Sequence, residues 1–146
     1  MAGRFGADLV VDGADADPVA ALRAAAGQRA DIVVDVTAKA PAALGQAVSL
    51  VRTGGTIVIA GTRGSDDTPG FIPDHIVFKE VRILGALGVD VDAYRAALEL
   101  LVSGKYPFAD LSRRVAGFDG IEALLQTMAG ETADLPPVHG VFVPGA

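Results

Sequence analysis

The sequence predicts an α/β fold built on a parallel sheet with flanking helices. Four apolar runs have consecutive rather than alternating apolar residues, which is typical of strands buried on both faces. Helix-like segments separate these runs, so the chain contains successive strand–helix–strand units. The 146 residues suffice for a core, and 51% of them are apolar against 21% charged. The runs are Leu9–Val11, Ile32–Val36, Thr56–Ala60 and Val81–Leu87, with a fifth, Gly140–Val143, near the C-terminus.

Capping residues mark two helices in the first half of the chain. Asp17 is an expected N-cap, and Pro18 takes the first helical position behind it. A second helix is expected over about residues 41–52, beginning at a proline and closed by the pair Gly54-Gly55. These helices would connect the first three apolar runs.

Apolar residues at helical spacing mark two further helices. Asp92 is the expected N-cap of the first, and Gly130 ends the second. Before them, the polar stretch Arg63–Pro73 predicts a loop followed by a short helical turn. The apolar positions are Tyr94, Ala97, Leu98 and Leu101 in the first helix and Ile121, Leu124, Leu125 and Met128 in the second.

Composition excludes several classes of function. The chain has no cysteine and two histidines, so it cannot form a thiolate zinc site and is a poor candidate for a histidine metal site. A net charge of −6 argues against nucleic acid as a partner. No apolar stretch approaches the roughly 20 residues that span a membrane, and Met1–Asp8 lacks the apolar centre of a signal peptide. A cytoplasmic location is therefore expected.

Four segments in order carry a family resemblance. No Gly-x-Gly-x-x-Gly turn occurs among the 18 glycines, although the strand pattern is of nucleotide-binding type. The ordered segments nevertheless resemble the C-terminal portion of the medium-chain, zinc-type alcohol dehydrogenases, and the resemblance covers essentially the whole chain. The segments are Phe5–Asp8, Ala30–Thr37, Val51–Gly61 and Phe78–Gly88.

The resemblance implies a truncated Rossmann-like sheet with flanking helices that lacks the first two strands of the family fold. Residues 1–87 would form a partial dinucleotide-binding domain, and residues 88–146 a tail that returns to the catalytic domain. The glycine turn and the zinc ligands would precede Met1. With a strand order of 3-2-1-4-5-6, a gap of about 10–15 Å would separate Leu9–Val11 from Ile32–Val36. We expect either that Leu9–Val11 pairs directly with Ile32–Val36 or that a second chain fills the gap.

The resemblance also assigns coenzyme contacts to the carboxyl ends of the strands, where ligands bind in such sheets. Each assignment has a plain structural alternative, namely a strand-to-helix turn, a glycine needed only for chain reversal, or a surface histidine. The residues expected near the adenine end are Val36, Thr37 and Ala38. Those expected at the nicotinamide carboxamide are Ala60, Gly61, Thr62, Ala86 and Leu87, and His139 is expected near the pyrophosphate.

No catalytic residue and no metal ligand are expected in this chain. Asp12 and Asp35 each end a predicted strand, but neither has an identifiable acid/base partner, so turn or cap roles are favoured. His75 is expected to be structural or exposed. Neither a Gly-x-Ser-x-Gly motif nor another Ser/His/Asp signature appears.

The resemblance implies that the apolar run Val81–Leu87 is an edge strand that pairs with its twin in a homodimer. The run itself is consistent with this, because an exposed apolar edge must be covered and Arg82 is its one charged residue. The expected function is that of a fragment of an NAD(P)-dependent alcohol dehydrogenase-like oxidoreductase. It would contribute part of the coenzyme cleft, bind NAD or NADP weakly or not at all alone, and leave zinc to the missing N-terminal half. Two alternatives stay open: a non-catalytic self-associating domain, and a fragment of a zinc-independent quinone reductase relative.

Overall fold

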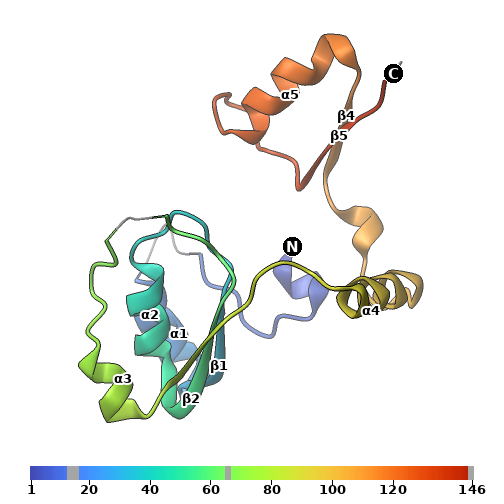
Figure 1. Ribbon diagram of the computed structural model, residues 1–146. Helices are drawn as coiled ribbons and strands as arrows, with labels where there is room; N and C mark the ends of the chain where they lie inside the picture. Colours follow the sequence, from blue (N-terminus) through green and yellow to red (C-terminus); the bar gives the residue numbers. More distant parts are fainter. Residues whose placement is uncertain (13–16, 65–66, 145–146) are drawn as a thin grey trace. The chain divides into compact units, whose positions relative to one another are not determined.

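The computed structural model describes residues 1–12, 17–64 and 67–144 and divides into two compact units, Met1–Val91 and Asp92–Ala146 (Figure 1). The first unit contains η1 (Ala2–Phe5), α1 (Pro18–Ala26), β1 (Ala30–Asp35), α2 (Ala43–Leu50), β2 (Val51–Ile59), α3 (Asp74–Lys79) and β3 (Arg82–Gly85). Helix α4 (Val91–Val102) starts at the boundary, and η2 (Phe108–Asp110), β4 (Arg113–Ala116), η3 (Phe118–Gly120), α5 (Ile121–Met128) and β5 (His139–Phe142) follow it. None of the helices among the described residues has the length and apolarity required to cross a membrane.

Unit 1 is built on a parallel sheet with the order β1-β2-β3, so β1 and β3 are its edges. The register places Asp35 beside Ile59 and Ile59 beside Gly85. The three strands therefore end level with one another, and their carboxyl ends form one edge of the sheet. The α/β class and the parallel sheet predicted from the sequence are confirmed.

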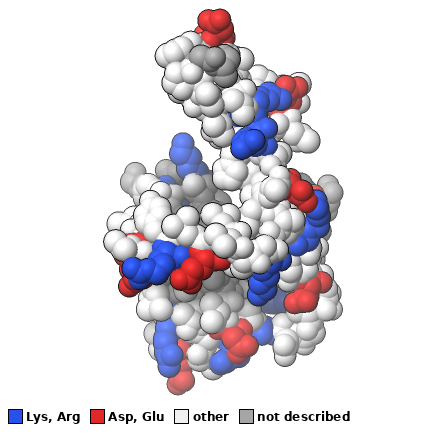
Figure 2. All heavy atoms as spheres, turned by 90° about the vertical axis from the view of Figure 1, so that its right-hand side faces the viewer, with Lys and Arg blue, Asp and Glu red and all other residues white. Residues whose placement is uncertain are grey.

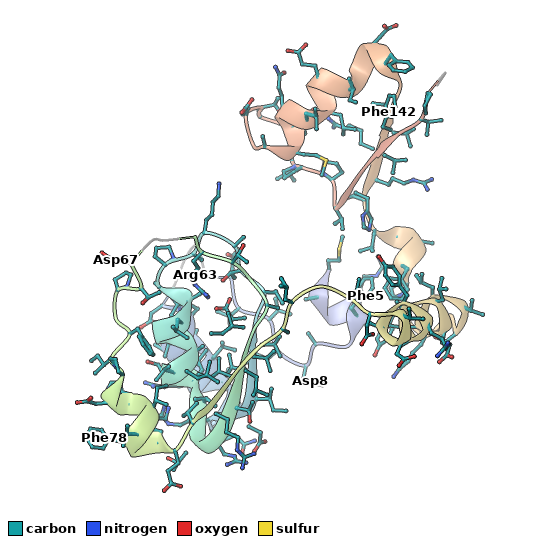
Figure 3. All side chains as sticks on the ribbon, in the orientation of Figure 1. Phe5, Asp8, Arg63, Asp67, Phe78 and Phe142 are labelled. Carbon is teal, nitrogen blue, oxygen red and sulfur yellow. The ribbon has the colours of Figure 1, made fainter. Side chains whose placement is uncertain are left out.

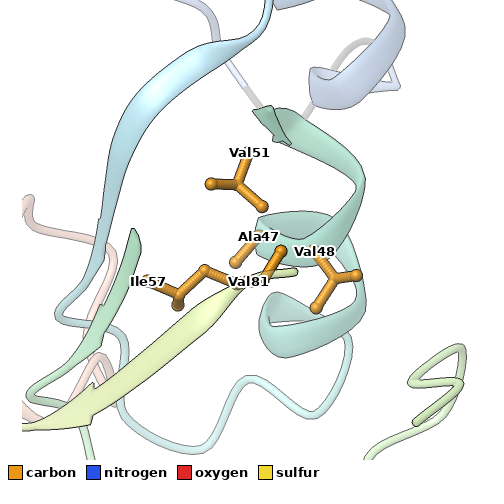
Figure 4. Packing of buried hydrophobic residues seen from close by; sticks show 5 residues of the cluster. All are labelled: Ala47, Val48, Val51, Ile57 and Val81. Atoms are coloured by element: carbon orange, nitrogen blue, oxygen red, sulfur yellow. The ribbon is translucent and has the colours of Figure 1, made fainter. Parts of the chain in front are cut away.

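Helices α1, α2 and α3 lie on one side of this sheet (Figure 1). Because strand residues alternate between faces, Val33 and Ile57 point toward the helices together. Figure 4 shows the resulting core, in which α2 and β2 supply most of the side chains. The buried cluster consists of Ala47, Val48, Val51, Ile57 and Val81, of which Val51 and Ile57 are fully buried.

Within unit 1, the opposite face of the sheet carries exposed side chains, although its consecutive apolar residues are typical of strands covered on both faces. Val34, Val58 and Leu84 are in register across the three strands and point away from the helices. Val34 is 58% exposed and Leu84 53% exposed. Consecutive apolar residues thus predicted β1, β2 and β3 correctly, but the described residues of unit 1 cover only one face of their sheet.

The predicted strand at residues 9–11 is wrong. These residues form no strand, and Val10 is 60% exposed. A β-strand needs a neighbour that satisfies its backbone groups, and residues 9–11 do not pair with β1. The option in which this segment closes the gap by pairing with β1 is therefore also wrong, whereas filling by a second chain stays a prediction.

The predicted N-cap of α1 is confirmed, whereas the predicted end of α2 is wrong. Asp17 Oδ1 accepts hydrogen bonds from the amides of Val19 (2.9 Å) and Ala20 (3.3 Å), as expected of an N-cap. The second helix ends at Leu50, and β2 begins at the next residue. Gly54 has φ 70° and lies within an irregularity of β2, where the register with β1 shifts, instead of closing the helix.

In unit 2, α5 packs on a two-stranded parallel sheet formed by β4 and β5. Leu124 and Thr127 of α5 are buried, and the rings of Phe118 and Phe142 meet edge to face at 5.1 Å. The sequence did not reveal β4, because its residues begin with two arginines. Helix α4 starts before Asp92, which forms an ion pair with Arg95 at 2.9 Å instead of the expected cap.

The structure describes the loop after β2 except for two residues. Residues 65 and 66 of the stretch predicted as a loop lie outside the described residues. The short helical turn expected after the loop is α3. His75 is exposed on α3, as expected, and Phe78 of the same helix is 76% exposed and points outward (Figure 3).

Candidate functional site

A buried ion pair joins the turns that follow β1 and β2. Asp35, the last residue of β1, accepts a hydrogen bond from Arg63, which lies in the loop after β2. Their side chains are 4% and 9% exposed, respectively. Arg63 Nε also donates to the carbonyl oxygen of Ala40 at 3.2 Å, so Arg63 lies beside the chain that leads into α2 (Figure 3). One guanidinium thus fixes the loop after β2 to two points of the turn after β1.

The Asp35 carboxylate also shapes its own turn. Its Oδ1 accepts hydrogen bonds from the Thr37 amide at 3.0 Å and the Thr37 hydroxyl at 2.5 Å. The carboxylate therefore accepts from three donors, and hydrogen bonds to an ionised carboxylate are strong. The turn role favoured for Asp35 agrees with this geometry, and Asp35 is not available as a general base.

Gly61 lies directly against the backbone of Thr37. A Cβ added at Gly61 would be 1.9 Å from the Thr37 carbonyl oxygen and 2.6 Å from its carbonyl carbon. The Gly61 amide donates to the Asp35 carbonyl oxygen at 3.1 Å, and the Lys39 amide donates to the Thr62 carbonyl oxygen at 3.3 Å. The two turns are thus interlocked, and only glycine permits the close approach. This contact gives Gly61 a packing role in addition to the predicted coenzyme contact.

The structure brings eight of the nine predicted coenzyme residues to one unit, at the carboxyl edge of its sheet. The Ala60 amide donates to Asp35 (2.9 Å), and the Ala86 amide donates to Ile59 (2.9 Å). Leu87 is 94% exposed, and no hydrogen bond within the described residues involves its amide. These eight residues are Val36, Thr37, Ala38, Ala60, Gly61, Thr62, Ala86 and Leu87.

His139, the ninth, belongs to unit 2 and begins β5. Its amide donates to the Ser112 carbonyl oxygen at 3.2 Å, and its register partner on β4 is Arg113. The His139 side chain lines a hollow of about 490 Å³ in unit 2. Contact of these residues with a coenzyme stays a prediction.

Three cationic side chains surround the C-terminal end of α2. Arg23 donates to the Ser49 carbonyl oxygen at 2.8 Å, Arg29 donates to the same oxygen, and Lys79 donates to Val48 and Val51. Cations stabilise this end of a helix because its last carbonyls have no helical partner. Burial, followed by the nearby charges of Arg29 and Arg23, lowers the pKa of Lys79. We assign these cations to the fold, because their polar atoms point into helix carbonyls.

The described residues contain no group of three or more His, Asp or Glu side chains that could hold a metal ion. With no cysteine in the sequence, they do not fit a catalytic zinc. What the described residues offer at the carboxyl edge of unit 1 is a set of main-chain amides and carbonyls held by the interlocked turns.

Sequence reasoning did not find Arg63 as a partner of Asp35. The two are 28 residues apart, and neither falls in a motif that links them. The only signal was their position, since each follows a strand whose carboxyl end meets the same edge of the sheet.

Comparisons with known proteins agree with this fold. The sequence profile of the zinc-binding dehydrogenase family matches residues 1–103. A protein of Mycobacterium tuberculosis named as a probable alcohol dehydrogenase is 63% identical over 145 residues, which are 99% of this chain and 40% of that protein. The chain therefore spans less than half the length of the curated relatives that it matches.

Solved structures give the same result. Benzyl alcohol dehydrogenase from Acinetobacter calcoaceticus superposes with a TM-score of 0.72 at 26% identity, over 90% of this chain and 37% of that one. The 2R,3R-butanediol dehydrogenase from Bacillus subtilis superposes with a TM-score of 0.71 at 27% identity, over 92% of this chain and 38% of that one. An alcohol dehydrogenase from Escherichia coli in complex with NADH shares the fold at a TM-score of 0.73 and 20% identity. By sequence and by fold, the chain belongs to the zinc-binding dehydrogenase family.

Proposed function

We propose that this chain is the C-terminal part of an NAD(P)-dependent alcohol dehydrogenase-like oxidoreductase and supplies part of its coenzyme cleft. The observation that carries this proposal is the 63% identity to a probable alcohol dehydrogenase over 99% of the chain. Because the alignment spans 99% of the chain, it includes the strand ends, the interlocked turns and the C-terminal segment. We place the protein in the cytoplasm.

The main chain at the carboxyl edge of unit 1 supports a role in holding nicotinamide. A carboxamide offers one acceptor oxygen and two donor hydrogens, so it needs both kinds of partner. The Ala60, Gly61 and Ala86 amides are used between strands, whereas Leu87 is almost fully exposed beyond β3. Leu87 would donate its amide to the carboxamide oxygen, and nearby main-chain carbonyls would accept from the carboxamide nitrogen. The coenzyme itself, when bound, supplies the hydride-accepting ring.

The interlocked turns would keep this edge rigid. Arg63, Asp35 and Gly61 fix the chain on either side of the predicted contacts through buried polar atoms. Binding a flat ring against main-chain atoms requires those atoms to be placed before the ligand arrives, since ordering them on binding would lower the affinity. Zinc ligands would come from the part of the family protein that this sequence does not contain.

We further propose that the chain alone does not oxidise alcohols and binds a dinucleotide weakly or not at all. This sequence has no glycine-rich turn at a helix N-terminus, which is the usual site of the pyrophosphate. Calorimetry with NAD and NADP tests the point, and micromolar binding to the isolated chain would contradict it. Co-expression with the remaining part of the Mycobacterium tuberculosis relative should restore coenzyme-dependent alcohol oxidation if the proposed function is right.

The exposed edge of β3 supports a second part of the proposal, a homodimer through residues 81–87. Strand β3 pairs with β2 on one side only, and Leu84 is half exposed. Sedimentation equilibrium at micromolar concentration should give twice the chain mass, and Leu84→Lys should reduce it to the monomer mass. A monomer at all concentrations would refute the dimer. A dimer that fails to gain activity on co-expression would favour the non-catalytic, self-associating alternative.

A further inference from the structure

Two methionines carry the sulfur chemistry of this chain. The sequence contains no cysteine, and its methionines are Met1 and Met128. Peroxides oxidise thioethers readily, and the product is methionine sulfoxide. On the face drawn in Figure 2, acidic and basic side chains are interspersed among mostly uncharged residues, so charge singles out no partner on that face. An oxidant, by contrast, is expected to act on this protein at the two methionines first.

The sulfur of Met128 lies against β5. Met128 is the last residue of α5, and a Cβ added at Gly140 of β5 would overlap its Sδ atom. The same Cβ would be 3.4 Å from the methyl groups of Leu124, one turn earlier on α5. The Met128 sulfur therefore fills the space that a side chain at residue 140 would occupy, and glycine at that position lets the end of the helix pack on the strand.

Strand β5 depends on this packing. Its one strand neighbour in the described part of the chain is β4, and the hydrogen bonds between them are followed by one from the Val143 amide to the Ala116 carbonyl oxygen at 3.0 Å. A sheet of two strands is at best marginally stable in water unless a helix packs on it. Met128 is nevertheless 44% exposed, so a small oxidant reaches this side chain from solvent. An accessible thioether thus takes part in a contact that holds β5.

We propose that Met128 is a reversible oxidation site that controls how firmly α5 holds β5. The sulfur donates an electron pair to one oxygen of a peroxide and the O–O bond breaks. The thioether becomes a sulfoxide, and the peroxide, reduced by two electrons, leaves as water or an alcohol. A sulfoxide is polar and accepts hydrogen bonds from water, so burying it against Gly140 and Leu124 is unfavourable. The side chain then turns to solvent, and β5 loses this contact.

The reverse step is a reduction by methionine sulfoxide reductase, in which a dithiol is oxidised to a disulfide and the sulfoxide oxygen leaves as water. The strand that is released begins with His139, one of the predicted coenzyme contacts. Oxidation of Met128 would therefore weaken that contact as well. Only this last consequence rests on the proposed function, since the oxidation and the loosening of β5 require no coenzyme.

The test treats the full 146-residue chain with hydrogen peroxide. Peptide mass spectrometry measures the sulfoxide at Met1 and Met128 separately, and NMR measures hydrogen exchange of single amides. Once Met128 is oxidised, the amides of His139 and Val143, which bond to the chain at either end of β4, should exchange about tenfold faster. Amides of β2 in unit 1 should change by less than about twofold. Treatment with methionine sulfoxide reductases should restore the original rates.

Two variants separate Met128 from other effects of peroxide. Met128→Leu keeps an apolar side chain and leaves Met1 as the one methionine, so peroxide should not change its exchange rates. Met128→Gln places a polar group at the same site and should speed exchange of the two amides without any peroxide. Both comparisons use the same two amides as the wild type.

Several outcomes would overturn the proposal. If Met1 is fully oxidised while Met128 is not, the Met128 sulfur is not accessible. If Met128 is oxidised and the two amides exchange within twofold of their original rates, the sulfur does not hold β5. Equal acceleration by peroxide in the wild type and in Met128→Leu would assign the effect to another group. Rates that stay high after the sulfoxide has been reduced would mean that the change is damage and not reversible control.

Discussion

Replacing Gly61 by alanine should separate the two turns at the carboxyl edge of unit 1. The new Cβ would lie 1.9 Å from the Thr37 carbonyl oxygen, whereas carbon–oxygen contacts are normally about 3.3 Å or longer. The chain must therefore move by about 1.4 Å, and the obstacle is backbone rather than a flexible side chain. Such a shift breaks the 3.1 Å hydrogen bond from the Gly61 amide to Asp35. Overpacking at about 1–3 kcal/mol and one lost hydrogen bond at about 1 kcal/mol give a destabilisation of roughly 2–4 kcal/mol.

Urea unfolding followed by circular dichroism at 222 nm measures this effect. With a denaturant slope of about 1–2 kcal/mol per molar urea, Gly61→Ala should lower the midpoint by about 1–4 M. Gly85→Ala in β3 is the matched control, because nothing lies within 4 Å of a Cβ at that position, and it should change the free energy of unfolding by less than about 0.5 kcal/mol. Both tyrosines lie in unit 2, so tyrosine fluorescence follows that unit separately. Equal midpoints for the two variants would refute the interlocked turns.

Three further predictions concern single side chains. Arg63→Met leaves the Asp35 carboxylate buried without its cation and should destabilise unit 1 by about 3–5 kcal/mol, whereas adding Asp35→Asn should recover part of this loss in the same urea assay. Since burial lowers the pKa of Lys79 below 10.5, the unfolded chain binds more protons at this site between the two values. The free energy of unfolding should therefore rise with pH in that window, and Lys79→Met should reduce the slope measured by urea titrations at several pH values. Leu124→Ala should cost about 2–5 kcal/mol by tyrosine fluorescence because Leu124 is 5% exposed, whereas Leu125→Ala, at a site 60% exposed, should cost much less. Similar losses in the two leucine variants would mean that α5 does not pack as described.

Features that depend on a few neighbouring residues could be predicted from the sequence. Asp17 and Pro18 specify the start of α1 without help from the rest of the chain, because an N-cap bonds to amides two and three residues away. The apolar runs that became β1, β2 and β3 were equally visible. Their order along the chain, with helices between them, was enough to predict a parallel sheet.

Features that depend on distant partners could not be predicted. Residues 9–11 have the composition of a strand, but a strand exists only where a neighbour accepts its hydrogen bonds. Strand β4 was missed for the opposite reason, since Arg113 and Arg114 are exposed and give no apolar signal. The pairing of Asp35 with Arg63 needs the sheet before the two side chains meet. The coenzyme contacts predicted from the family resemblance stay predictions.

Because one face of the sheet in unit 1 is open, the free energy of unfolding of this protein depends on whether another polypeptide binds to that face. Ile32, Val34, Val36 and Leu84 are each more than half exposed, and burying the remainder of each side chain is worth about 1 kcal/mol. Covering all four would add roughly 4 kcal/mol, a large fraction of the 5–15 kcal/mol that holds a typical domain folded. By mass action, any polypeptide that docks on this face shifts the folding equilibrium as a ligand does. The amount of folded chain in a cell should therefore rise and fall with the supply of that polypeptide.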